Sequence, residues 1–402
     1  MIDQDMMRIR NLSQVLECIR TSGGPCTKRG IQAGTGLSWA SASGLTEELI
    51  QQGYVIETTR RSENSLGRPA KAYDINPRRN LYIGVDINVE SLHLAVIDLK
   101  CRLLYTESKM LVEYERDSIV GMVKEMIRRA LDSGPVNAGE VKGVGFALMS
   151  VVDIENGVAV YSQHFKDWKN VSIRRIFEDE FRLPVLVEHD PTCLAIAEMN
   201  LGHGKFNSKV VYLRVSLGIG VSIVLDGRIY KGANGSSGEF GHMCVDLDGP
   251  LCSCGKRGCI EAYASVSGMA ARYREDVKKQ AGYSGFSERS VEGDIAVVNK
   301  LAKAALNKDA AAQRYFDAAA GALGIGIGNL ISLLNPDKVI IGGIFTEFER
   351  LYMKTLMDTV GAASWPYFTV DIVNSNMPPE TAAIGAASLF IQQRVWENRR
   401  RQ

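Results

Sequence analysis

The sequence predicts an α/β chain in two parts, a small N-terminal domain over residues 1–78 and a larger two-lobed domain over residues 79–402. Three observations support this prediction. Apolar residues recur at helical spacing between residues 6 and 52, and two strand-like runs follow them. From Leu81 onward, apolar strands are interspersed with helices, and glycines follow the strand ends. At 402 residues, the chain is long enough to give both parts a hydrophobic core.

The composition is that of an ordinary globular protein, with 46% hydrophobic and 23% charged residues. The sequence contains no stretch of about 18 apolar residues without charge, so we expect no membrane span. Met1–Arg10 lacks the apolar segment of a signal peptide. We therefore expect a cytoplasmic protein. A net charge of +1 argues against a general polyanion binder, although residues 1–80 hold 11 Lys and Arg against 8 Asp and Glu.

The first part has the element order of a winged helix-turn-helix. We expect helices over residues 6–20, 28–33 and 38–52, with Thr27 and Ser38 as N-caps of the second and third. Strand-like segments over residues 54–59 and up to Ile75 then form a hairpin, the wing. Two helices joined by a tight glycine-containing turn are typical of DNA-binding domains. A packing module with no DNA role is the alternative.

The side chains of this part favour DNA binding. The third helix begins with a small, polar face, and the hairpin loop is basic, which suits phosphate contacts or a narrow minor groove. Operator DNA is therefore the predicted partner. The predicted contacts are Ser38, Trp39, Ser41, Ser43, Arg60, Arg61, Arg68 and Lys71. Such domains bind inverted repeats as two-fold dimers, so we expect a homodimer or homotetramer.

Three cysteines and a histidine form the most specific local pattern. The segment 238–242 ends in His242, and a glycine-rich loop then carries Cys252, Cys254 and Cys259 at C-x-C-x₄-C spacing. Three thiolates and one imidazole complete a tetrahedral zinc site, and a reducing cytosol argues against disulfides. Four protein ligands leave no position for a catalytic water, so we predict one structural zinc per chain. Buried cysteines beside a core histidine are the alternative.

These segments together resemble the ROK family of repressors, open reading frames and sugar kinases. The E-x-G-H motif at 239–242, followed by C-x-C-G-x-x-G-C-x-E at 252–261, is similar to the family's signature. Residues 67–70 with Asn76-Pro77 resemble the wing and exit of the family's repressors, and residues 84–86, 218–220 and 340–343 resemble its nucleotide-binding segments. The resemblance covers nearly the whole chain. It implies an actin/hexokinase-type, sugar-kinase-like domain with two lobes around a cleft.

The resemblance also implies a sugar-binding site, because carboxylates give directional hydrogen bonds to sugar hydroxyls. Asp190 matches the family's catalytic aspartate, although it could simply cap a helix. Packing is the alternative for His164 and His189, and His242 would serve as both zinc ligand and pocket wall. The predicted sugar contacts are His164, His189, Asp190, Glu239, His242 and Glu261.

The phosphate loops argue against catalysis. Family kinases carry Asp-x-Gly-Gly-Thr, whereas residues 86–91 here are Asp-Ile-Asn-Val-Glu-Ser. Side chains replace the glycines where the backbone would approach the phosphates, and Glu90 adds a negative charge there. We therefore predict a non-catalytic repressor of carbohydrate genes, with Asp190 as a vestigial base and a sugar or sugar-phosphate effector. An active sugar kinase, or a dual regulator-kinase, is the rival; a regulatory protein partner is a further alternative.

Overall fold

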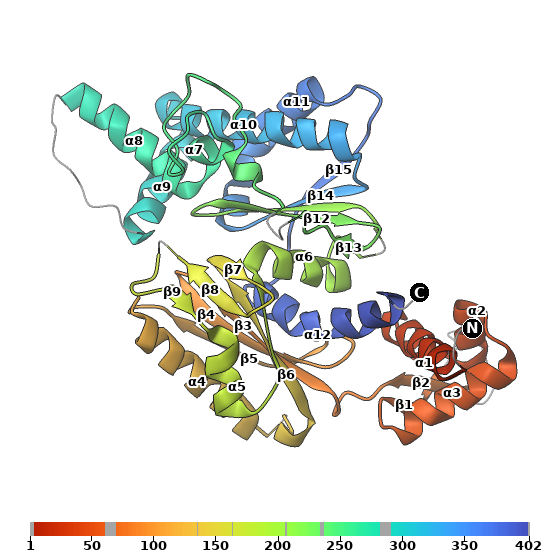
Figure 1. The fold of residues 1–402 in the computed structure, drawn as a ribbon. Coiled ribbons are helices and arrows are strands. Elements are labelled where there is room, and N and C mark those ends of the chain that lie inside the picture. Colours follow the sequence, from red (N-terminus) through yellow and green to blue (C-terminus); the bar gives the residue numbers. More distant parts are fainter. Residues whose placement is uncertain are drawn as a thin grey trace. The chain divides into compact units, whose positions relative to one another are not determined.

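A computed structural model describes residues 4–60, 70–134, 136–162, 164–205, 207–233, 237–281 and 291–400. The chain divides into two compact units (Figure 1). Unit 1 comprises Met1–Ile196 and Pro379–Gln402, and unit 2 comprises Ala197–Pro378. The C-terminal segment therefore returns to the unit in which the chain begins.

Unit 1 begins with the helices and hairpin that the sequence predicts. The elements are α1 Gln4–Thr21, α2 Lys28–Thr35, α3 Trp39–Gln51, β1 Val55–Arg60 and β2 Ala70–Ile75, with β1 and β2 antiparallel. Thr27 and Ser38 are the N-caps, because their hydroxyl oxygens accept the N–H groups of Gly30 and Ser41. Buried apolar residues form the core of this domain, among them Val15, Ile19, Ile31 and Leu49.

A five-stranded sheet in the order β10-β6-β3-β4-β5 forms the centre of unit 1. Its strands are β3 Leu81–Ile87, β4 Ser91–Ile97, β5 Leu103–Met110, β6 Val141–Leu148 and β10 Val185–His189. Strands β3, β4 and β5 form the expected antiparallel meander, and β6 and β10 continue the sheet in parallel. The other elements are α4 Arg116–Asp132, η1 Ala138–Glu140, α5 Ile173–Phe181, α6 Asp190–Leu201 and a small sheet of β7 Val151–Asp153, β8 Val158–Tyr161 and β9 Lys169–Val171.

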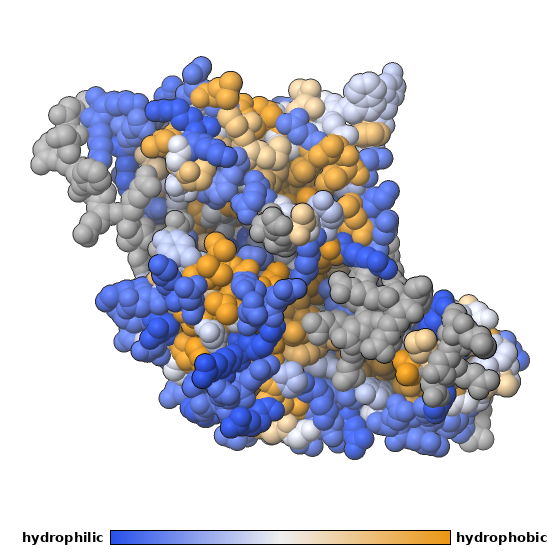
Figure 2. Space-filling model, in the orientation of Figure 1, coloured by the Kyte–Doolittle hydropathy of each residue, from blue (hydrophilic) through white to orange (hydrophobic). Residues whose placement is uncertain are grey.

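Alternation along β6 directs neighbouring residues to opposite faces of this sheet. Phe146 packs against Phe177 of α5, with ring centroids 4.6 Å apart. Gly145 contacts the C-terminal helix α12 (Thr381–Arg400) instead. The surface over α4 and α5 is largely hydrophilic, and ion pairs such as Lys124–Glu180 join these two helices there (Figure 2).

Helix α12, which the sequence did not predict, approaches β3 and β6 very closely. A Cβ at Gly84 would lie 1.8 Å from the carbonyl oxygen of Ala383, and one at Gly145 would lie 2.0 Å from that of Ala386. On the helix side, a Cβ at Gly385 would lie 1.8 Å from the carbonyl oxygen of Cys193. Only glycine permits such backbone contacts, so these positions fix how near the helix lies to the sheet.

Unit 2 contains a second five-stranded sheet, in the order β13-β12-β11-β14-β15. Strand β11 pairs antiparallel with β12 and parallel with β14. The strands are β11 Val210–Val215, β12 Ile219–Leu225, β13 Arg228–Ile229, β14 Lys338–Gly342 and β15 Asp371–Asn374. The helices are η2 Phe240–His242, α7 Ile260–Ala264, α8 Val266–Ala281, α9 Val291–Leu306, α10 Ala310–Leu334, η3 Ile344–Phe348 and α11 Glu349–Ala363.

Helix α10 is the one described helix that is long and apolar enough to cross a membrane. Its most apolar window is 56% buried inside the protein. Phe316, Leu323 and Ile327 are fully buried, and the helix packs against α7, α9 and α11. Its apolar character is therefore that of a core helix.

We predict that Gly84→Ala lowers the thermal unfolding midpoint, because its methyl group would displace the α12 backbone at Ala383. Overpacking of this kind costs about 1–3 kcal/mol of unfolding free energy. Gly121→Ala in α4 is the matched control, since a Cβ there meets nothing within 4 Å. Calorimetry should show the control at or slightly above the wild-type midpoint. Equal midpoints for the two variants would contradict the packing argument.

Candidate DNA-binding, metal and effector sites

The predicted DNA-binding side chains at the start of α3 differ in their exposure to solvent. Ser38, Trp39 and Ser41 are exposed, and the Trp39 side chain is half accessible although it is large and apolar. Ser43 is partly buried and accepts a hydrogen bond of 2.9 Å from Nζ of Lys28 on α2. The ammonium group of Lys28 also pairs with Glu47 at 2.9 Å. These contacts of Lys28 join two helices, so local sequence spacing does not predict them.

The wing is described only in part. Lys71 on β2 is exposed and forms an ion pair of 2.9 Å with Glu57 on β1, and this hydrogen bond raises the pKa of Lys71. Exposed pairs of this kind contribute little to stability, so Lys71 remains available to an incoming anion. The predicted contacts Arg61 and Arg68 lie outside the described residues, as does the side chain of Arg60.

The structure brings together the four residues expected to bind zinc. One ligand atom from each of His242, Cys252, Cys254 and Cys259 lies within 4.8 Å of the others. Nδ1 of His242 is 3.7 Å from Sγ of Cys252, and Sγ of Cys254 is 3.7 Å from Sγ of Cys259. Burial raises the pKa of the Cys259 thiol to about 12, whereas the backbone N–H of Lys256 lowers the pKa of Cys254. Sulfur and imidazole donors at this separation suit a tetrahedral ion.

Backbone hydrogen bonds fold the cysteine loop back on itself. The N–H of Cys252 donates to the carbonyl oxygen of Lys256 at 2.8 Å, and that of Val245 donates to Gly258 at 2.9 Å. Gly258 has φ +68°, and a Cβ there would lie 1.5 Å from the carbonyl oxygen of Asp246. Glycine is therefore required at this position, which lies beside the ligand Cys259.

A partly buried arginine supports the segment that leads into the same loop. The guanidinium of Arg272 lies 5.2 Å from the ring centre of Tyr263 and 5.6 Å from that of Tyr315, and Nη2 donates to both residues' carbonyl oxygens. Tyr263 in turn donates its hydroxyl to Asp246 at 2.6 Å. Burial and this hydrogen bond raise the pKa of Tyr263 to about 12. The stacked side chains thus tie helices α7, α8 and α10 to the segment that carries Asp246.

Glu261 and Glu239 flank the cysteine loop with different roles. Glu261 accepts the N–H of Ile219 at 3.0 Å and the hydroxyl of Ser253 at 3.2 Å. It therefore ties the glycine-containing turn before β12 to the cysteine loop, a role that sequence analysis did not predict. The side chain of Glu239 is 72% exposed, and its Oε2 lies 4.0 Å from Nε2 of His242. His242 consequently presents Nδ1 to the thiols and Nε2 toward a carboxylate, the arrangement that orients many histidine ligands of metals.

The other predicted sugar contacts belong to unit 1. His189 is the last residue of β10 and Asp190 the first of α6, so the expected strand-to-helix junction is confirmed. Asp190 is only 7% exposed. His164 is partly buried, and its N–H donates to the hydroxyl of Ser162 at 3.3 Å. Glu239, His242 and Glu261 belong to unit 2.

The loop between β3 and β4 is tightly closed. The N–H of Asn88 donates to the carbonyl oxygen of Ser91 at 3.2 Å, and the carbonyl oxygen of Glu90 accepts the N–H of Leu111 at 3.1 Å. Val89, which replaces a glycine of the kinase motif, is completely buried. The loop backbone is thus held by its own chain and by a packed side chain.

Comparisons with known proteins agree with this architecture. The ROK family profile matches residues 82–393, and an IclR helix-turn-helix domain profile matches residues 9–57. The chain carries a helix-turn-helix followed by a sugar-kinase-like domain, and it belongs to the ROK family. It is 26% identical to the xylose repressor of Caldicellulosiruptor bescii over 88% of this chain and 89% of the relative.

Three further similar proteins are one transcriptional regulator and two solved structures. The chain is 27% identical to the transcriptional dual regulator NagC of Escherichia coli K12, over 96% of this chain and 93% of NagC. A crystal structure of a ROK family transcriptional regulator, a homologue of the E. coli MLC protein, superposes with TM-score 0.77 at 26% identity, covering 98% of each chain. The ROK hexokinase of Thermus thermophilus superposes with TM-score 0.66 at 25% identity, covering 78% of this chain and 99% of the hexokinase.

The Ser38 cap supplies a test of how α3 is held. Ser38→Ala removes the acceptor for the N–H of Ser41 and should destabilise the first turn by about 1 kcal/mol. Amide hydrogen exchange over residues 39–45 should then be about fivefold faster, because local opening is easier. Ser38→Asp should exchange like the wild type, since aspartate caps as well as serine does. Unchanged exchange in Ser38→Ala would show that the cap is dispensable.

Proposed function

We propose that this protein is a sequence-specific DNA-binding repressor of carbohydrate-metabolism genes, controlled by a sugar or sugar-phosphate effector. The observation that carries the proposal is the attachment of a helix-turn-helix to a sugar-kinase-like domain whose first phosphate loop is closed around buried Val89. The relatives named xylose repressor and NagC share both parts, since the similarity covers most of each chain. A repressor that binds operator DNA would act in the cytoplasm, so we propose that location for this protein.

DNA binding is proposed for the domain over residues 1–78, with residues 79–402 as the effector domain. The exposed start of α3 would enter the major groove, and the wing would contact phosphates or the minor groove. Exposed Ser38, Trp39 and Ser41 support the first contact, and Lys71 supports the second. A homodimer or homotetramer would present two such domains to an inverted repeat.

The effector domain is proposed to bind sugar without transferring phosphate. Kinase catalysis requires backbone amides that surround the phosphates and a base for the sugar hydroxyl. Asp190 could supply the base, but Val89 and the hydrogen bonds of residues 88–91 leave the first loop closed. The proposed sugar contacts are His164, His189, Asp190, Glu239, His242 and Glu261. Of the three carboxylates in this set, Glu239 is exposed, Glu261 is partly buried and Asp190 is buried.

A structural zinc ion is proposed for His242, Cys252, Cys254 and Cys259. The donor set fits, because four soft or borderline ligand atoms lie within 4.8 Å of one another. When bound, zinc would supply a rigid cross-link rather than a Lewis acid, since the protein provides all four ligands. The chain's own groups do the rest: Glu261 ties this loop to the turn before β12, and Gly258 lets it fold back.

Metal analysis of the purified protein tests this site. We expect about one zinc per chain, as for a single four-ligand site. Cys254→Ser should lose the ion and lower the unfolding midpoint, because metal-binding energy is also folding energy. Cys244→Ser is the matched control: Cys244 is exposed in the same loop but outside the four-residue cluster. A metal-free wild type of normal stability would contradict the proposal.

Selection from a random DNA pool by the full-length protein tests the main proposal. We expect enrichment of inverted repeats whose half-sites lie about 10 base pairs, or a multiple of this, apart. Lys71→Ala should weaken binding to all sequences and reduce the salt slope by about 1, because it removes one phosphate contact. Lys354→Ala, which removes an exposed ion pair in unit 2, should behave like the wild type. The DNA-binding proposal fails if no sequence is enriched.

A further inference from the structure

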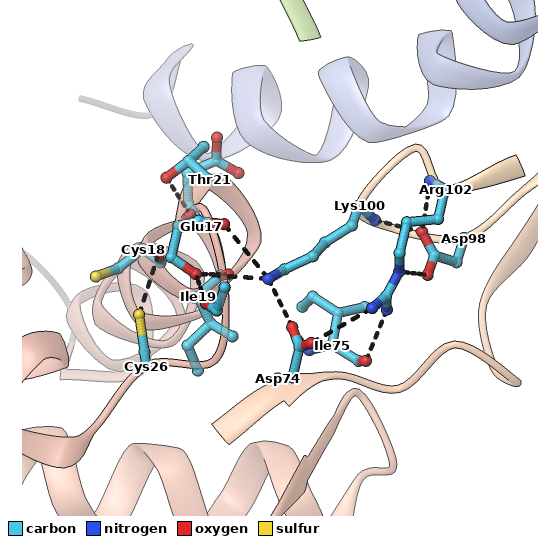
Figure 3. A network of polar contacts seen from close by, with 12 residues as sticks. Glu17, Cys18, Ile19, Thr21, Cys26, Asp74, Ile75, Asp98, Lys100 and Arg102 are labelled. Atoms are coloured by element: carbon cyan, nitrogen blue, oxygen red, sulfur yellow. Dashed lines mark hydrogen bonds and ion pairs between the residues drawn. The ribbon is translucent and has the colours of Figure 1, made fainter. Parts of the chain in front are cut away.

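The winged helix is attached to the rest of unit 1 through a partly buried cluster of charges at the turn between β4 and β5 (Figure 3). Lys100 and Arg102 extend from this turn, and Asp98 lies at its start. Their partner from the winged helix is Asp74 on β2. We call these four residues the junction cluster.

Lys100 links two elements of the DNA-binding domain at once. Its Nζ lies 2.6 Å from Oδ1 of Asp74 on the wing strand. The same Nζ donates to the carbonyl oxygen and the hydroxyl of Ser22, which follows α1, at 3.4 and 3.5 Å. The side chain of Lys100 is only 9% exposed and that of Asp74 is 16% exposed. A single buried ammonium group from the effector domain therefore contacts both the end of α1 and the wing.

The turn that presents Lys100 is itself held rigidly. Asp98, whose side chain is fully buried, accepts the backbone N–H groups of Lys100 at 2.8 Å and Arg102 at 3.0 Å, as well as Nε of Arg102 at 2.6 Å. Cys101 adopts the left-handed conformation, with φ +61°. These contacts fix the direction of the two basic side chains before they meet the winged helix.

Arg102 completes the contact from the other side. Its Nη1 lies 3.3 Å from Oδ2 of Asp74, and its Nη2 donates to the carbonyl oxygen of Ile75 at 3.0 Å. Two cations thus face two carboxylates; the side chain of Asp98 is fully buried, whereas that of Arg102 is 40% exposed. A buried pair is directional, and removal of one member leaves an uncompensated charge, so such a cluster favours one geometry over nearby alternatives.

Another ion pair between the two domains is more exposed. Arg79 in the connecting segment pairs with Glu140 at 3.4 Å, but half of its side chain is exposed. Helix α1 also contacts α12. The junction cluster is therefore the described ionic link best shielded from solvent, and salt screens buried pairs much less than exposed ones.

We propose that the junction cluster holds the winged helix in one orientation on the effector domain, and that this orientation sets operator affinity. The proposal rests on the proposed function, because it concerns binding to an inverted repeat. Such a repeat requires both winged helices of a dimer at a defined spacing. A winged helix that is free to reorient loses that preorganisation and must be ordered at the moment of binding. Lys100 and Asp74 are thus positioning residues, which act on DNA through the domain they hold.

The experiment compares Lys100→Met, Asp74→Asn and the double variant with Lys100→Arg as the conservative rescue. Lys354→Met, in an exposed pair of unit 2, is the control. Amide exchange over residues 19–27 is measured without DNA, and fluorescence anisotropy measures affinity for DNA selected by the wild type. We expect Lys100→Met to exchange faster there and to bind DNA at least about tenfold more weakly, a loss of about 1.4 kcal/mol.

Four further readouts separate positioning from a general loss of folding or of phosphate contacts. The salt slope of DNA binding should stay at the wild-type value, because no phosphate contact is removed. Zinc content should also stay unchanged, and the double variant should be no weaker than the worse single variant, as expected for coupled partners. Lys100→Arg should recover most of the affinity.

The proposal is overturned if Lys100→Met and Asp74→Asn both show the amide exchange and DNA affinity of the wild type. It is also overturned if a reduced salt slope accounts for the whole loss of DNA affinity. Tighter DNA binding by the variants would also overturn it. If the wild type selects no DNA, the proposed function fails and the affinity half of this proposal falls with it. The exchange measurement needs no DNA, so it still decides whether the cluster fixes the orientation of the domain.

Discussion

The close approach of α12 to β3 and β6 is the constraint on which unit 1 depends. Gly84 and Gly145 leave space for the helix backbone, and the C-terminal segment thereby completes the fold around the central sheet. The same helix contacts α1 of the winged helix, so one element packs against both the sheet and the DNA-binding domain. Dense protein interiors resist compression. The α12 contacts therefore do not deform gradually when one of the packed elements is displaced.

Unit 2 depends on a comparable local constraint around the cysteine loop. Gly258, the Tyr263–Arg272–Tyr315 stack and the hydrogen bonds of Glu261 hold the loop in place through contacts from several elements. Residues 218–220, at the turn before β12, resemble a nucleotide-binding segment of the family. Here Glu261 ties that turn to the loop with the proposed zinc ligands, so metal binding and the geometry of the turn are physically linked.

Features encoded within short segments could be predicted from the sequence. The caps Thr27 and Ser38, the wing hairpin and the approach of His242 to the three cysteines all follow from local spacing, and the structure confirms them. Contacts between residues that are distant in sequence could not be predicted. Nothing local to Gly84 indicates Ala383, nothing near Ser43 indicates Lys28, and the pairing of Lys100 with Asp74 depends on how two domains meet.

The chain joins a helix-turn-helix to a sugar-kinase-like domain, and we propose that the latter senses a sugar rather than phosphorylating it. Phosphoryl transfer and sensing would share a sugar site, so residues such as Asp190 do not distinguish them; the proposal of sensing rests on the loop that holds buried Val89. A ligand changes DNA affinity only by binding the two conformational states with different affinity, and about 1.4 kcal/mol of coupling gives a tenfold effect.

The most direct test titrates selected operator DNA with the protein in the presence of D-xylose, D-glucose, N-acetyl-D-glucosamine or their phosphates, with and without Mg-ATP. Mass spectrometry of the sugar follows each titration. The account predicts that at least one of these compounds changes operator affinity equally with and without Mg-ATP, and that no sugar gains a phosphate. ATP-dependent phosphorylation of the sugar, or no response of operator affinity to any of them at millimolar concentration, would contradict it.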